Sequence, residues 1–192
     1  MNRCYLSPRI TLVTSLQRAH SFETGTPKEH GFIARLLDVE KNPRYTPTAT
    51  STFCNIAAHD FATIWGAYIP RVWWTLEALK RKDTQANYGK NCVELNANAL
   101  YDWFINHGGR FGWGRTDLKE AQEITNAGGL AVIVARNKNR RKSGHISVIM
   151  PGNVEAIPHQ WNAGRVNKAS FRSSWYTRTT FDAWGVWVLR RP

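Results

Sequence analysis

The chain has 192 residues, of which 42% are hydrophobic, and this composition excludes a wholly disordered protein. Lys and Arg outnumber Asp and Glu by 26 to 14, and the net charge of +12 favours an anionic partner such as a nucleic acid, lipopolysaccharide or an acidic wall polymer. The three cysteines, which are Cys4, Cys54 and Cys92, form no CxxC pair and no zinc-type spacing, so we predict neither a disulfide framework, nor a metal site, nor a cofactor.

The N-terminal region carries no strong targeting signal. Its first 20 residues contain Arg3 and Arg9 beside a short stretch of mixed polarity, which is too polar for a signal peptide. No run approaches the ~20 apolar residues that a membrane-spanning helix needs. We therefore expect a protein made in the cytoplasm without a clear signal peptide, with no membrane span, and a monomer by default. Residues 1–27 are expected to form an extension and residues 28–192 a single domain.

Helical patterns occupy the first two thirds of the chain. A short helix is expected over 30–40, followed by an extended, proline-containing segment that leads to Cys54. Apolar residues recur at helical spacing over 54–65, 93–107 and 117–126, which predicts three further helices. The candidate N-cap residues are Thr50, Ser51 and Thr52 for the first of these helices and Thr116 for the last.

Strand patterns follow the helices. The apolar run 130–135 predicts a buried strand, and residues 145–150 predict a strand that returns after a basic turn. Two more strands are expected over 154–158 and 184–189. Because helices come first and antiparallel strands follow, the predicted fold class is α+β.

Cys54 and His145 are the candidate catalytic pair. Cys54 begins the predicted helix 54–65, where unpaired N–H groups and the helix dipole favour an anionic sulfur. His59 lies five residues later, about 140° around the helix, so it faces away from the thiol and is assigned a structural role. His145 opens a later strand directly after Gly144, whose small size leaves room for a substrate. A thiol activated by an imidazole is the arrangement of a cysteine hydrolase.

Several segments around these two residues resemble the NlpC/P60 and CHAP superfamily of peptidoglycan hydrolases, which includes phage endolysins and bacterial wall amidases. The segments that carry this resemblance are Thr52-Phe-Cys-Asn55, Gly144-His-Ile-Ser-Val-Ile149, Asn42-Pro-Arg-Tyr-Thr-Pro47, Glu94-Leu-Asn-Ala-Asn98, Glu120-Ala-Gln122 and Asn126-Ala-Gly128. The similarity covers about residues 30–170. It implies a papain-like fold, with N-terminal helices packed on an antiparallel sheet, and a bacteriolytic enzyme that cuts an amide bond of the wall peptide.

The resemblance also implies a polar residue that orients the histidine ring from the following strand. Asn162 best matches that position, and Gln160, His159 and Glu155 remain as alternatives. The candidate substrate-binding residues are Asn55, Gly144, Trp73, Trp74, Trp113 and Trp161, of which the tryptophans would stack on sugars or line the groove. The candidate residues for steering the enzyme to peptidoglycan, or to anionic envelope polymers such as lipopolysaccharide, are Arg136, Lys138, Arg140, Arg141 and Lys142.

Other functions stay open at this point. A lysozyme needs two placed carboxylates, and Glu29 and Asp38 have a suggestive spacing, but Arg44 stands where that pattern places a threonine. The net charge would also suit a nucleic-acid-binding protein. A papain-like site could instead serve a secreted antibacterial toxin, an acyltransferase or a protein peptidase. For a wall enzyme, the bond cut could be N-acetylmuramoyl–L-alanine or one within or between stem peptides.

Overall fold

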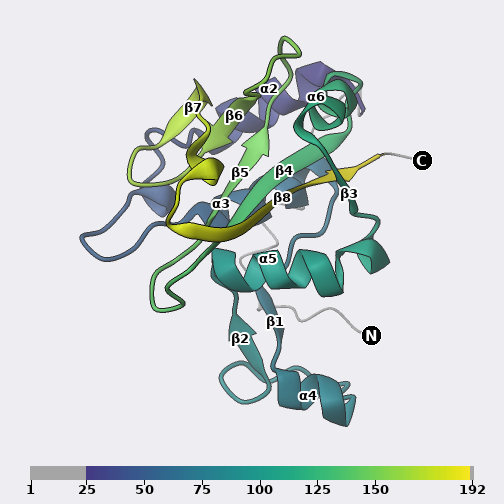
Figure 1. Ribbon diagram of the computed structural model, residues 1–192. Coiled ribbons are helices and arrows are strands. Elements are labelled where there is room, and N and C mark those ends of the chain that lie inside the picture. The colour runs from purple at the N-terminus through teal and green to yellow at the C-terminus, as the bar shows by residue number, and fades with distance from the viewer. Residues whose placement is uncertain (1–24, 191–192) are drawn as a thin grey trace.

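A six-stranded antiparallel sheet lies at the centre of the computed structural model, which describes residues 25–190 (Figure 1). In spatial order its strands are β3 (Gly114–Thr116), β8 (Phe181–Leu189), β4 (Leu130–Asn137), β5 (His145–Ile149), β6 (His159–Asn162) and β7 (Lys168–Arg172). The strands β4, β5, β6 and β7 follow one another both in the chain and in the sheet, so short turns can join them. The antiparallel register places the start of β5 beside the end of β6.

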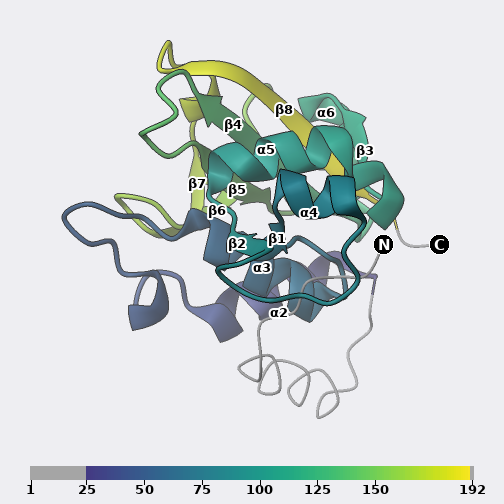
Figure 2. The same cartoon turned by 90° about the horizontal axis from the view of Figure 1, so that it is seen from below.

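Helices cover the sheet. They are α2 (Pro27–Leu37), α3 (Cys54–Trp65), α4 (Leu76–Arg81), α5 (Ala97–Asn106) and α6 (Leu118–Asn126). The turns of 3₁₀ helix are η1 (Pro43–Tyr45), η2 (Gly108–Phe111) and η3 (Trp175–Thr177), and a separate ribbon pairs β1 (Val72–Trp74) with β2 (Cys92–Glu94). Helix α2 packs against α3, as Figure 2 shows, and in Figure 1 the ribbon and α4 project beyond α5. Every helix among residues 25–190 is too short or too polar to cross a lipid bilayer.

The central strand β4 is buried on both faces, which explains its continuous apolar run. Successive side chains of a strand point to opposite faces of the sheet. Val132 and Val134 therefore join the core beneath α3 and α5, whereas Ala131 and Ile133 join a second core that includes Ala121 of α6. The predicted α+β class is confirmed, with helices on both faces of one antiparallel sheet.

The predicted bounds of a helix are right where the spacing of apolar residues sets them. They are wrong where a polar side chain caps the helix at another residue. Helix α3 has the predicted bounds of 54–65. Helix α5 begins later than expected, because the Asn96 side chain accepts a hydrogen bond from the Ala99 N–H and caps the helix there. Helix α6 is capped by Asp117 and not by Thr116, which belongs to β3.

The strand predicted over 154–158 is wrong. These residues form an irregular connection, and β6 begins only at His159. Strand β8, by contrast, starts three residues before its predicted range of 184–189. Residues 1–24 of the predicted extension, with Cys4, lie outside the described residues, and Pro27 already opens α2.

A buried carboxylate ties the segment before Cys54 to helix α3. Asp60 accepts hydrogen bonds from Arg44 Nε at 2.6 Å, from Arg44 Nη2 at 3.0 Å and from the Tyr45 hydroxyl at 2.9 Å. Asp60 and Tyr45 are both buried. The Asn42–Tyr45 stretch is therefore held by a specific polar contact and not by regular structure alone.

We expect Asp60→Ala to lower the free energy of unfolding by about 1–3 kcal/mol, because it leaves the buried Tyr45 hydroxyl and the Arg44 guanidinium without their acceptor. Urea denaturation followed by tryptophan fluorescence measures this change. The matched control is Glu123→Ala, which removes an exposed carboxylate 4.0 Å from Lys119 and should change stability by less than about 0.5 kcal/mol. Equal losses for the two variants would contradict the structural role of Asp60.

Candidate active site

Cys54 is the first residue of helix α3, and its sulfur meets the open end of that helix. The first intrahelical bond runs from the Ala57 N–H to the Phe53 carbonyl, and Phe53 has no side-chain oxygen that could cap the helix. The predicted caps Thr50, Ser51 and Thr52 are therefore wrong; these residues line the adjoining cleft instead. The backbone of Asn55 and that of Ile146 each hydrogen-bond the Cys54 thiol. The missing cap leaves the helix N-terminus to stabilise a sulfur anion.

The histidine and asparagine reach the same place from neighbouring strands. His145 begins β5 and Asn162 ends β6, and Nε2 of His145 donates to Oδ1 of Asn162 at 2.5 Å. The Asn162 amide is oriented by its other end, because Nδ2 donates to the Val166 carbonyl at 2.9 Å. This contact turns Oδ1 toward the imidazole and leaves Nδ1 of His145 for the sulfur, with which the ring hydrogen-bonds.

Cys54 and His145 change each other's acidity. Burial raises the pKa of the Cys54 thiol, but the charge and hydrogen bond of His145 and the two backbone hydrogen bonds outweigh burial, so the pKa lies below its ordinary value. Burial lowers the pKa of His145, but the charge and hydrogen bond of Cys54 and the bond to Asn162 outweigh it, so this pKa is raised. Both directions favour a thiolate beside an imidazolium.

Trp175 forms a wall beside the imidazole and was missed by the sequence analysis. Its ring meets that of His145 edge-on, with the centroids 4.4 Å apart. Its Nε1 donates to Oε1 of Gln160 at 2.7 Å, and Ser147 Oγ donates to the same oxygen at 2.8 Å. In the sequence, Trp175 is distinguished only by its place in the polar segment Ser173–Arg178. That place does not indicate which strand the tryptophan would contact.

The alternatives to Asn162 have other partners. Gln160 is fully buried and holds Trp175, as described above. His159 Nδ1 lies 3.3 Å from the Ser170 hydroxyl, and Glu155 forms an ion pair with Arg172. Asn162 is thus the candidate that contacts the imidazole. The lysozyme-like pair Glu29 and Asp38 lies on and after α2, and neither residue lines the cleft.

A cleft of about 1220 Å³ opens over these residues. Its walls come from the segment before α3, the β4–β5 turn, the β6–β7 turn and the stretch around η3. His145 and Asn162 lie in its lining, beside the residues that flank Cys54. Within residues 25–190, no three His, Cys, Asp or Glu side chains gather as a metal site would require.

The tryptophans predicted to bind substrate lie in the core, which corrects that prediction. Trp73, Trp74, Trp113 and Trp161 are each at most 4% exposed, and none of them lines the cleft. They fill the space between the helices and the sheet; Trp161, for example, packs with its ring centroid 5.3 Å from that of Phe61. Their large apolar rings contribute to folding and are not available for stacking on a sugar.

Two other predicted binding residues line the cleft but are already engaged. Asn55 Nδ2 donates to the Leu95 carbonyl at 2.8 Å, which joins the start of α3 to the segment before α5. Gly144 is crowded by the protein itself, because a Cβ atom there would lie 2.2 Å from the Ala135 carbonyl oxygen and 2.7 Å from Asn98 Oδ1. The absence of a side chain at Gly144 therefore allows α5 to approach the β4–β5 hairpin. Glycine is required here by this close packing and not, as expected, by the need for substrate space.

We expect Gly144→Ala to displace the neighbouring His145 and to lower both stability, by about 1–3 kcal/mol, and catalytic activity. Circular dichroism melting measures the loss of stability, and an activity assay measures the second effect. Gly109→Ala is the matched control, since a Cβ there meets nothing within 4 Å. A Gly144→Ala protein with wild-type stability and activity would contradict the close packing at this position.

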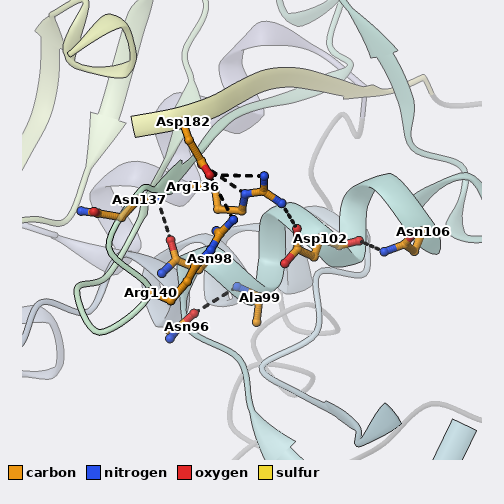
Figure 3. Close-up of polar contacts among 9 residues, drawn as sticks. All are labelled: Asn96, Asn98, Ala99, Asp102, Asn106, Arg136, Asn137, Arg140 and Asp182. Carbon is orange, nitrogen blue, oxygen red and sulfur yellow. Dashed lines mark hydrogen bonds and ion pairs between the residues drawn. The ribbon is translucent and has the colours of Figure 1, made fainter. Parts of the chain in front are cut away.

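The base of the basic β4–β5 turn is anchored to α5 and β8. Figure 3 shows Arg136 between Asp102 of α5 and Asp182 of β8, and the distances are 2.8 and 3.2 Å. Arg140 also contacts Asp182, at 3.1 Å. The Asn98 side chain stabilises both ends of this turn, because it accepts a hydrogen bond from the Asn137 N–H and donates one to the Lys142 carbonyl.

The predicted basic surface is therefore only partly neutralised. Arg136 and Arg140 are ion-paired, whereas Lys138, Arg141 and Lys142 are exposed and have no side-chain partner among residues 25–190. Arg141 and Lys142 line the cleft. Their position beside His145 agrees with the expectation that this turn overhangs the site.

No protein-family model matches the chain, and no curated protein matches it either.

Proposed function

We propose that this protein is a cysteine amidohydrolase of papain-like architecture that cuts an amide bond in the peptide part of peptidoglycan. The observation that carries the proposal is the meeting of Cys54, His145 and Asn162 beneath one cleft, from three different elements. The resemblance of the surrounding segments to NlpC/P60 and CHAP hydrolases supports the choice of substrate. The site of action would then be the bacterial cell wall.

The chemistry follows from the charge states. The Cys54 thiolate attacks the amide carbonyl, and the N–H groups at the start of α3 stabilise the oxyanion that forms. The His145 imidazolium donates its proton to the leaving amine, and the C–N bond breaks to leave a thioester. Neutral His145 then takes a proton from water, which attacks the thioester, releases the carboxylic acid and restores the thiolate.

Asn162 acts as a positioning residue in this scheme. Its carbonyl oxygen accepts from Nε2 and so keeps Nδ1 directed at the sulfur in each step. An amide can do this without taking up a proton, so the orientation of the ring does not change with pH near neutrality. Trp175 also restricts the rotation of the His145 ring through its edge-on contact with it.

Analysis of digested peptidoglycan tests the proposal. Purified peptidoglycan is incubated with the wild-type protein, and the soluble fragments are identified by mass spectrometry. New free amines and carboxyl groups would identify amide cleavage and show which bond is cut. Cys54→Ala provides the inactive reference, and Cys92→Ala is its matched control, because Cys92 is equally buried but lies in β2, outside the cleft. New reducing sugar ends, or no soluble fragments, would overturn the proposal.

A further inference from the structure

The cleft above Cys54 is lined by cations far in excess of anions. Within residues 25–190, its walls carry a single carboxylate, Glu94, which forms an ion pair with Arg71 at 3.2 Å. The basic side chains of the lining are Arg71, Arg141, Lys142, Arg165, Lys168 and Arg178. They come from several separate segments, namely the α3–β1, β4–β5 and β6–β7 connections, β7 and the stretch after η3. A cleft walled by one sign of charge concentrates ligands of the opposite sign.

Some of these cations already have partners. Arg71 pairs with Glu94, Lys168 lies 3.9 Å from Glu40, and Arg165 donates to the Thr48 carbonyl at 2.6 Å. The side chains of Arg141, Lys142 and Arg178 have none within residues 25–190. Three unpaired cations that face one cleft repel one another, and an anionic ligand would relieve that repulsion.

Arg178 is the unpaired cation best placed to act on the reacting bond. It directly follows η3, whose first residue, Trp175, contacts the His145 ring. Its charge is near enough to His145 to oppose the rise of that imidazole's pKa. An arginine also offers a planar fork of donors that matches both oxygens of a carboxylate.

We infer that the cleft selects substrates that carry a carboxylate beside the scissile amide, and that Arg178 binds the carboxylate nearest to the reacting carbonyl. The inference rests on the proposed function insofar as the substrate is an amide cut at Cys54. Arg141 and Lys142, on the β4–β5 turn, bind negative charge further along the same substrate. The cleft thus distinguishes acidic wall peptides from peptides whose carboxylates are amidated.

The first test uses Cys54 itself and needs no peptidoglycan. Iodoacetate and iodoacetamide both react with a thiolate, which displaces iodide from the methylene carbon and forms a thioether. They differ in that only iodoacetate carries a carboxylate. We expect the ratio of their rates at Cys54, measured by peptide mass spectrometry at fixed pH, to fall about tenfold in Arg178→Gln and to recover in part in Arg178→Lys. The ratio, unlike either rate alone, does not depend on the fraction of thiolate.

The matched control for this test is Arg35→Gln, an exposed arginine of α2 outside the cleft, which should keep the wild-type ratio. A second test compares wall peptides with free and with amidated carboxylates. We expect kcat/KM of the wild type to be about tenfold to a hundredfold higher for the free acid, mainly through KM, and this preference to shrink in Arg178→Gln.

The outcomes separate the two proposals. A reagent ratio that Arg178→Gln leaves unchanged overturns the role of Arg178, even if peptidoglycan is cut. A ratio that falls as expected, in a protein that releases nothing from peptidoglycan, supports carboxylate recognition at Cys54 and removes the wall as the substrate. Equal hydrolysis of free and amidated peptides overturns the selectivity alone.

Discussion

Replacing Cys54 with alanine is expected to abolish amide hydrolysis, with kcat/KM lower by roughly 10⁴-fold to 10⁶-fold. The sulfur is the atom that would form the thioester. Cys54 stands between the cleft-lining residues Phe53 and Asn55, whereas Cys92, the other thiol among the described residues, is buried in β2. Release of amines from purified peptidoglycan measures the loss. Because His145 and Asn162 remain, substrate binding should survive and KM should change little.

The folded state of the Cys54→Ala protein must be checked in the same experiment. Cys54 is 2% exposed, so its removal leaves a small cavity and lowers the free energy of unfolding by about 1 kcal/mol. A melting curve close to that of Cys92→Ala would show that lost activity is chemical and not a consequence of unfolding. A Cys54→Ala protein that keeps most of its activity would eliminate the thiol mechanism.

The second large effect is expected from His145→Gln, and it appears as a change in pH dependence. In the wild type the thiol pKa is lowered and the imidazole pKa is raised, and both shifts favour a thiolate–imidazolium pair. Activity should therefore fall on the acid side as the thiol is protonated, and on the alkaline side as the imidazolium loses its proton. The two limbs belong to the coupled pair and not to either residue alone.

Without the imidazolium, only the two backbone hydrogen bonds still oppose burial, so the thiol pKa should be higher than in the wild type. Alkylation of His145→Gln by iodoacetamide should consequently be slow at pH 7 and increase only at alkaline pH, whereas the wild type should react at neutral pH. Amide hydrolysis should drop by roughly 10⁴-fold or more, because the leaving amine has no proton donor. Identical alkylation profiles for the two proteins would contradict the ion pair.

The candidate catalytic residues could be selected from the sequence because two of them stand at an informative boundary. Cys54 is the first residue of a segment in which apolar residues recur at the helical spacing of about 3.6 residues. His145 follows a glycine at the start of an apolar strand. The third residue was less determined, since the segment from Glu155 to Asn162 offers four polar side chains, with both end residues included. Only the register of β5 against β6 brings Asn162, and not Gln160, to the ring.

Tryptophan illustrates what the sequence left undecided. Trp161 and Trp175 both stand among polar neighbours, yet Trp161 packs against Phe61 in the core while Trp175 lines the cleft beside His145. The difference arises because β6 presents Trp161 to helix α3, whereas η3 lies on the other face of the sheet. Local composition does not carry that information, since it depends on which elements pack together.

The sequence by itself determined the α+β class, the bounds of α3 and the choice of Cys54 and His145 as candidate catalytic residues. It could do so because apolar periodicity and the ends of helices and strands are local properties of the sequence. The tertiary structure alone decided that Trp175 and Arg178 border the reacting pair, that four predicted binding tryptophans are core residues, and that Asp182 neutralises part of the basic turn. These are contacts between segments distant in the chain. Their free energies depend on burial and on charge separation, which exist only after the sheet has formed.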